Sequence, residues 1–301
     1  GKFAPIFSNL FEVLYICVMC VAPAVAFATG GATLSELTGL PYLFCTFLIG
    51  VFIFIVAIFG TDLVRRVASV LSVCIIAGLL IVYIPNIISG FSGIRDAVSS
   101  MTAAELPLGD ALYSAFLYGT FQLSNIAVFV QHAKSFERPK DAVKSMGVGF
   151  VVNSLMMLMV VLGLMTVYTD PGAADQSVPT LFMVQNGVGA SFMTPLISIL
   201  IILGAVSTAV NMVAAMVKRV CGETGTGEKE KNGEKKRFNI SRKEIVAAIV
   251  CCIVDFGIAQ FGLLTLIQKA YSAIAYLAIP VILIPYIVHM IVTRFDTKTT
   301  E

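Results

Sequence analysis

Long apolar stretches constrain this chain more than any other feature of its sequence. A membrane-spanning helix needs about 20 mainly apolar residues. Eight stretches meet this requirement, at residues 8–29, 41–60, 66–88, 109–132, 143–168, 190–217, 244–261 and 263–291. Of the 301 residues, 58% are hydrophobic and only 13% are charged, whereas soluble domains carry about 25% charged residues. The sequence therefore predicts an all-α fold, a polytopic bundle of about eight spanning helices that forms one transmembrane domain over 1–301 in a lipid bilayer.

Lysine and arginine residues are concentrated in every second connection between these stretches. The two ends of the chain and the connections after residues 60, 132 and 217 are basic, whereas the other connections hold at most one basic residue. Because basic segments stay on the cytoplasmic side, both ends are expected to be cytoplasmic in a multi-pass plasma membrane protein. The connection at 222–243 is rich in Gly, Glu and Lys, which predicts a flexible cytoplasmic loop. The net charge of +2 gives no general attraction to nucleic acid.

The connection at 169–190 contains a short apolar segment, residues 178–184. This segment is too short to span a bilayer. Two interpretations remain open, a lid that dips into an outer vestibule and an amphipathic helix that lies on the surface.

Residues typical of enzymes are sparse. The two histidines, His132 and His289, each lie near the predicted cytoplasmic end of a helix. The sequence contains no H-E-x-x-H motif, no G-x-S-x-G motif and no cluster with metal-ligand spacing. We therefore expect a protein that is not an enzyme, with no catalytic residues and no cofactor. The sequence carries no signal for an oligomeric state.

Polar residues gather halfway along the predicted span 109–132. They are Tyr118, Gly119, Thr120, Gln122, Ser124 and Asn125. Polar groups at this depth are costly unless a partner or water satisfies them. One interpretation is an unwound segment that binds a small-molecule substrate through its exposed backbone. The other is polar contact between packed helices. We expect substrate binding at these six residues.

A second group of polar residues lies in the predicted span 190–217. Ser207 and Thr208 offer two adjacent hydroxyl oxygens, the ligand type that hard cations prefer. Asn211 follows Ser207 by four residues and therefore lies on the same helix face. The alternative is that these side chains bond to the preceding turn of their own helix. In the span 244–261, Asp255 is either a proton site or a side chain that reaches the outer interface.

Five short motifs occur in order over nearly the whole chain. They are Gly1-Lys2 with Ile6-Phe7, Gly30-Gly31-Ala32-Thr33-Leu34 with Gly39-Leu40-Pro41, Leu117-Tyr118 through Asn125-Ile126-Ala127, Val178-Pro179-Thr180-Leu181, and Ser207-Thr208-Ala209-Val210-Asn211-Met212 followed by Val217-Lys218-Arg219. In this order and spacing they resemble the YkvI family of bacterial membrane proteins. That resemblance implies a location in a bacterial inner membrane.

The YkvI family looks related to the amino acid–polyamine–organocation superfamily, whose fold is an inverted repeat of five plus five helices. The resemblance implies that the eight predicted spans correspond to the third to tenth helices, and that this chain is a truncated form without the first two. The span 109–132 would then be the broken sixth helix. Ser207 and Thr208 would be ligands of a coupling sodium ion on the eighth helix.

Together these features predict a cation-coupled secondary transporter that moves a small organic solute by alternating access. Sodium is the expected coupling ion and an amino acid is the expected solute. A non-transporting receptor or assembly subunit built on the same bundle is the alternative, and a membrane-embedded enzyme is the third hypothesis.

Overall fold

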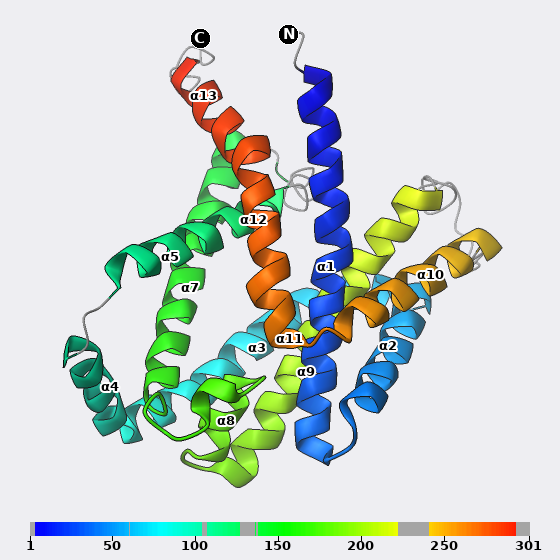
Figure 1. The fold of residues 1–301 in the computed structure, drawn as a ribbon. Helices are drawn as coiled ribbons and strands as arrows, with labels where there is room; N and C mark the ends of the chain where they lie inside the picture. The colour runs from blue at the N-terminus through cyan, green and yellow to red at the C-terminus, as the bar shows by residue number, and fades with distance from the viewer. Residues whose placement is uncertain are drawn as a thin grey trace. The chain divides into compact units, whose positions relative to one another are not determined.

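The computed structural model is all-α, and it describes residues 4–59, 61–103, 107–126, 136, 138–221 and 241–292. Its longer helices are α1 (Ala4–Thr38), α2 (Tyr42–Phe59), α3 (Thr61–Ser89), α4 (Phe91–Ala103), α5 (Leu108–Leu123), α7 (Pro139–Met165), α9 (Ala190–Cys221) and α10 (Arg242–Ala259) (Figure 1). Shorter helices are α8 (Pro179–Gln185), α11 (Leu263–Thr265), α12 (Ser272–Ala278) and α13 (Ile284–Val292). A helix therefore lies in each of the eight predicted spans.

Six helical segments among the described residues are long and apolar enough to cross a membrane. They are Ile6–Thr38, Tyr42–Phe59, Val70–Ser89, Lys140–Met165, Ala190–Cys221 and Leu263–Val292. The chain is therefore a multi-pass membrane protein with a lipid bilayer around it. The predicted spans 109–132 and 244–261 are not among the six. In the first, α5 has only 16 residues, and in the second, α10 carries three charged residues in its first turn and Asp255 near its end.

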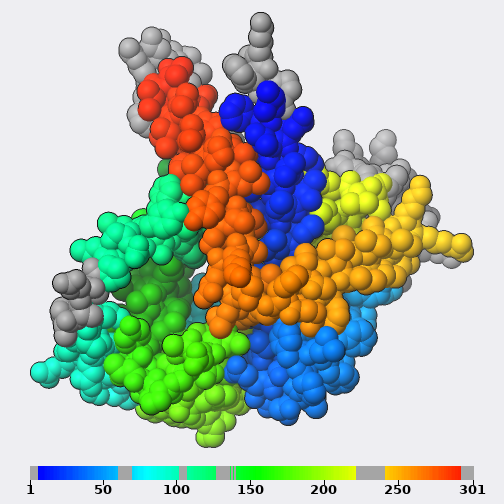
Figure 2. Space-filling model, in the orientation of Figure 1, coloured from blue at the N-terminus to red at the C-terminus, as the bar shows by residue number. Residues whose placement is uncertain are grey.

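The chain divides into two compact units. Unit 1 consists of Gly1–Val18, Met101–Met156 and Thr265–Glu301, and unit 2 consists of Met19–Ser100 and Met157–Leu264. Within unit 1, α5 packs along α12 and contacts the π-helical turn Ile279–Leu283. Within unit 2, α9 contacts α2, α3, α8 and α10. Helices α2 and α10 also lie side by side (Figure 2).

Glycine residues bring α1 and α2 into close contact in unit 2. A Cβ atom at Gly31 would lie 2.9 Å from the Cα of Thr46, and one at Gly50 would lie 2.7 Å from the ring of Phe27. Ala28 on the same stretch of α1 is fully buried. Small side chains allow two helix backbones to approach closely in a membrane, and the stretch of small residues in α1 performs this packing role.

The short apolar segment 178–184 forms α8 and is packed into unit 2. The side chains of Leu181 and Val184 are fully buried. The hydroxyl groups of Tyr83 and Thr180 are 2.7 Å apart and share a hydrogen bond between α3 and α8. Just after α8, the backbone N–H of Val188 donates to Asn86 Oδ1 at 2.9 Å. This segment is therefore held against α3 and does not lie loosely on the surface.

Replacing Asn86 with alanine should destabilise the protein, because Asn86 is buried and would leave the Val188 N–H without its acceptor. A lost partner for a buried group costs about 1–3 kcal/mol. The midpoint of thermal unfolding in detergent should fall. Asn186→Ala is the matched control, since Asn186 is exposed and bonds only to its own helix at Phe182. Equal midpoints for both variants would contradict the role of Asn86.

Two segments differ from the sequence-based expectation. Residues 91–103 form α4, where only a connection was expected. Ile94 and Ala97 of this helix are buried, and Gly93 allows it to contact the backbone carbonyl of Thr166. The predicted loop 222–243 ends earlier than expected, because Ser241 caps α10 and the helix begins at Arg242. The rest of that loop, residues 222–240, lies outside the described residues.

Candidate functional site

A row of polar side chains follows one face of α5 and the turn after it in unit 1. Tyr118, Gln122 and Asn125 recur at intervals of three and four residues, which places them on the same face of the chain. The side-chain Nε2 of Gln122 donates to the Tyr118 hydroxyl at 2.7 Å. The side-chain Nδ2 of Asn125 donates to Gln122 Oε1 at 3.5 Å. The three side chains therefore form one hydrogen-bonded row, and Gly119 beside it leaves open space within 4 Å.

Helix α5 ends within this polar stretch. Its last residue is Leu123, and the next two residues form a turn. In this turn the N–H of Ser124 donates to the Phe121 carbonyl at 3.0 Å, and that of Asn125 donates to the Gln122 carbonyl at 3.2 Å. The expectation of an unwound backbone is therefore wrong for residues 118–123, because regular helical bonds continue as far as Leu123. Residues 127–132 of the predicted span lie outside the described residues.

Thr120 and Ser124 are not part of the exposed row. Both side chains are only 3% exposed. The Thr120 hydroxyl donates to the Phe116 carbonyl at 2.8 Å, and the Ser124 hydroxyl donates to the Phe121 carbonyl at 2.5 Å. Because these hydroxyls satisfy carbonyls of their own helix, they act as local structure. Of the six predicted substrate-binding residues, the structure thus brings Tyr118, Gly119, Gln122 and Asn125 together.

Aromatic side chains lie next to the row. The ring of Phe121 stacks on that of Tyr271, with 4.0 Å between centroids and 17° between planes. Tyr271 is the last residue of the π-helical turn Leu266–Tyr271, a geometry that often occurs at functional sites. Amide, hydroxyl and aromatic surfaces therefore meet at one place in unit 1.

Tyr271 and Phe121 were missed by the sequence analysis. An aromatic residue in an apolar span looks like packing, and the stacking partner lies about 150 residues away in the sequence. The only signal near Tyr271 is the polar pair Gln268-Lys269 just before it. That pair interrupts an apolar stretch where the helix departs from regular α-geometry.

The predicted cation-binding residues lie on α9, in unit 2. Thr208 and Asn211 are exposed, and Ser207 is half-buried. The Thr208 hydroxyl donates to the Gly204 carbonyl at 3.0 Å, and Asn211 Nδ2 donates to the Ser207 carbonyl at 2.9 Å. Each oxygen keeps acceptor capacity for a cation, but a hard ion such as Ca²⁺ takes about six oxygen ligands. This turn of α9 therefore supplies part of a coordination shell at most.

Acidic and metal-ligating residues are scattered in the part of the chain that the structure describes. No group of three or more His, Cys, Asp or Glu side chains occurs there that could hold a metal ion. Asp255 on α10 is only 3% exposed. The interpretation in which the Asp255 side chain reaches the outer interface is therefore wrong, because that side chain is buried inside the protein.

The chain was compared with family models, with curated proteins and with solved structures, and none of these three comparisons finds a match.

Proposed function

We propose that this chain functions in cation-coupled secondary transport of a small organic solute, as its resemblance to the YkvI family implies. One observation carries the proposal, the hydrogen-bonded row of the exposed Tyr118 and Gln122 on α5 and the half-buried Asn125 in the turn that follows. Exposed amides on an apolar membrane chain are costly unless a ligand or water satisfies them. A solute that passes along this face would supply those hydrogen bonds.

The chemistry of the row favours a zwitterionic solute, such as an amino acid. Amide N–H and tyrosine hydroxyl groups can donate to a carboxylate, and amide oxygens can accept from an ammonium group. The helix end after Leu123 adds carbonyl oxygens that attract positive charge. None of these groups carries a net charge, which disfavours a solute of high charge. The stacked rings of Phe121 and Tyr271 offer an apolar surface for a side chain.

The division into two compact units also supports the proposal. Alternating access in transporters proceeds largely by rigid-body movement of one group of helices against another. We propose that the helices follow the five-plus-five inverted repeat, with eight spans and cytoplasmic ends. We further propose that Ser207, Thr208 and Asn211 contribute oxygens to a sodium site.

Uptake by cells that express the protein tests this function. With a mixture of ¹⁴C-labelled amino acids, uptake should be saturable and should fall when choline replaces sodium. Ser207→Ala combined with Thr208→Ala should raise the sodium concentration for half-maximal uptake by roughly a hundredfold, since each of the two lost contacts to a charged group costs about 1.5 kcal/mol or more. Ser198→Ala, at a buried hydroxyl bonded within α9, is the control. Uptake that is independent of sodium would contradict cation coupling, and no uptake of any solute would favour the receptor alternative.

The variant Gly119→Ala should change the uptake rate without lowering the stability of the protein. A Cβ atom at residue 119 meets nothing within 4 Å, so the variant should be as stable as the wild type or more stable by up to about 1 kcal/mol. Uptake should nevertheless fall severalfold, because the methyl group occupies space beside the polar row. Thermal unfolding and initial uptake rates measure the two effects, and unchanged uptake would remove Gly119 from the site.

A further inference from the structure

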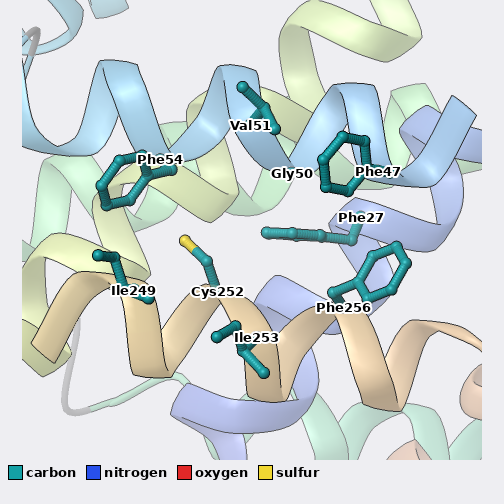
Figure 3. Close-up of a pocket in the computed structure, with 9 residues that line it drawn as sticks. All are labelled: Phe27, Phe47, Gly50, Val51, Phe54, Ile249, Cys252, Ile253 and Phe256. Atoms are coloured by element: carbon teal, nitrogen blue, oxygen red, sulfur yellow. The ribbon is translucent and has the colours of Figure 1, made fainter. Parts of the chain in front are cut away.

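An apolar groove of about 270 Å³ lies between α1, α2 and α10 in unit 2 (Figure 3). Its nine lining residues carry no charged group, and the Cys252 thiol is the only side chain with a heteroatom. The rings of Phe47 and Phe256 meet edge to face at one end, with centroids 6.3 Å apart. Figure 3 shows the Cys252 sulfur directed from α10 into the space below α2. The groove therefore suits an apolar ligand.

The groove is open at its rim, since Phe47 is 54% exposed and Ile253 is 63% exposed. Both side chains line the groove and also continue onto the outer surface. Helix α2 is one of the six candidate membrane spans, and exposed apolar side chains on such a helix suit contact with hydrocarbon. The volume is below the roughly 300–1,000 Å³ of pockets that enclose drug-sized ligands. The small volume, the apolar lining and the open rim suit part of a hydrocarbon chain that continues into the bilayer.

Positive charge lies at one end of the same helix. Arg242 and Lys243 form the exposed first turn of α10, six residues before Ile249 in the groove wall. At 1.5 Å per residue, this separation is about 9 Å along the helix axis. The carboxylate of Glu244 accepts from the Ser241 N–H at 3.0 Å in a capping box. Two cations at a helix N-terminus, where the helix dipole is also positive, favour an anion.

We propose that this groove binds one acyl chain of an anionic phospholipid, whose phosphate group lies at Arg242 and Lys243. The apolar groove matches the acyl chain, and the cationic first turn of α10 matches the phosphate group. The two features follow one another along α10 as the two groups do in the lipid. The bias of basic residues places this end of α10 on the cytoplasmic side, the leaflet in which anionic lipids carry the negative surface potential. This lipid site is independent of the transport function.

A tryptophan introduced into the groove tests the site, because the chain contains no tryptophan of its own. Phe54→Trp replaces one aromatic lining residue by another. Phe52→Trp on the same helix is the control, since Phe52 is exposed and does not line the groove. Each purified variant is placed in phosphatidylcholine vesicles. One series receives rising fractions of brominated phosphatidylglycerol, and the other receives rising fractions of brominated phosphatidylcholine, with the bromine atoms on the acyl chains in both. Quenching of the tryptophan fluorescence reports acyl-chain occupancy.

For Phe54→Trp, quenching should show roughly a tenfold preference for brominated phosphatidylglycerol, given two basic side chains near the headgroup. For Phe52→Trp, the two headgroups should quench equally. Adding Arg242→Gln and Lys243→Gln to Phe54→Trp should reduce the preference to below about twofold. The double substitution Arg242→Lys and Lys243→Arg, which preserves both charges, should leave the preference for brominated phosphatidylglycerol unchanged. Equal quenching by both lipids in Phe54→Trp would overturn the proposal, as would a preference that survives removal of both charges or is lost in the exchange.

Discussion

Replacing Gln122 with leucine should lower solute uptake by about tenfold or more, while the thermal stability of the protein stays nearly unchanged. Gln122 is the middle member of the polar row, bonded to Tyr118 on one side and to Asn125 on the other. Leucine removes the amide through which Gln122 would bind the solute, and each hydrogen bond to the solute is worth about 1 kcal/mol. Because Gln122 is exposed, the fold loses little when its amide is removed.

The uptake rate at low solute concentration and the thermal midpoint in detergent measure these two effects. Gln260→Leu is the matched control, since Gln260 is also exposed and its amide bonds only to the Phe256 carbonyl of its own helix at 2.9 Å. The control should transport normally. If Gln122→Leu transports as well as the control, the exposed face of α5 does not contact the solute. If Gln122→Leu unfolds at a lower temperature, the row has a structural role instead.

Gly31→Leu should prevent stable packing of α1 on α2 and cost about 3 kcal/mol or more. Even a single Cβ atom at this position would lie 2.9 Å from both the Cα and the Cβ of Thr46. The Cα belongs to the backbone of α2, so no side-chain rotation relieves the overlap. Overpacking a well-filled core typically costs 1–3 kcal/mol, and here two helices must separate to accept four extra carbon atoms.

Fluorescence-detected size exclusion and thermal unfolding of the purified protein measure this effect. Gly257→Leu provides the control, because it makes the same chemical change in a helix of unit 2 where a Cβ atom meets nothing within 4 Å. The control should express and unfold as the wild type does. A normal midpoint for Gly31→Leu would mean that α1 and α2 do not approach as closely as described.

The helices could be predicted well because hydrophobic length alone selects them. A bilayer requires long apolar segments with internally bonded backbone, and this requirement can be read residue by residue. The same criterion misses α4, whose 13 residues are too few to span and include Arg95 and Asp96. It also gives no information on α8, because the burial of Leu181 depends on contacts with distant helices.

The candidate site could be predicted only in part. The concentration of polar residues in 109–132 led to the prediction of one unwound binding segment, whereas in the structure helical spacing places Tyr118, Gln122 and Asn125 on one face. It did not distinguish them from Thr120 and Ser124, whose hydroxyls turn back to their own helix. That choice depends on side-chain rotation. The stacking of Tyr271 on Phe121 depends on tertiary packing, which no local pattern encodes.

The hydroxyl groups of this chain have a consequence for its biogenesis. Thr46, Thr120, Ser198 and Thr208 each donate to the carbonyl one turn earlier in the same helix. Each of these helices can insert into the bilayer on its own, because its hydroxyl groups are already hydrogen-bonded within the helix and need no partner from another helix. The contacts of Tyr83 and Asn86 join separate segments instead. We therefore expect the helices to insert into the membrane first. The packing of α8 against α3 should follow and complete the folding of unit 2.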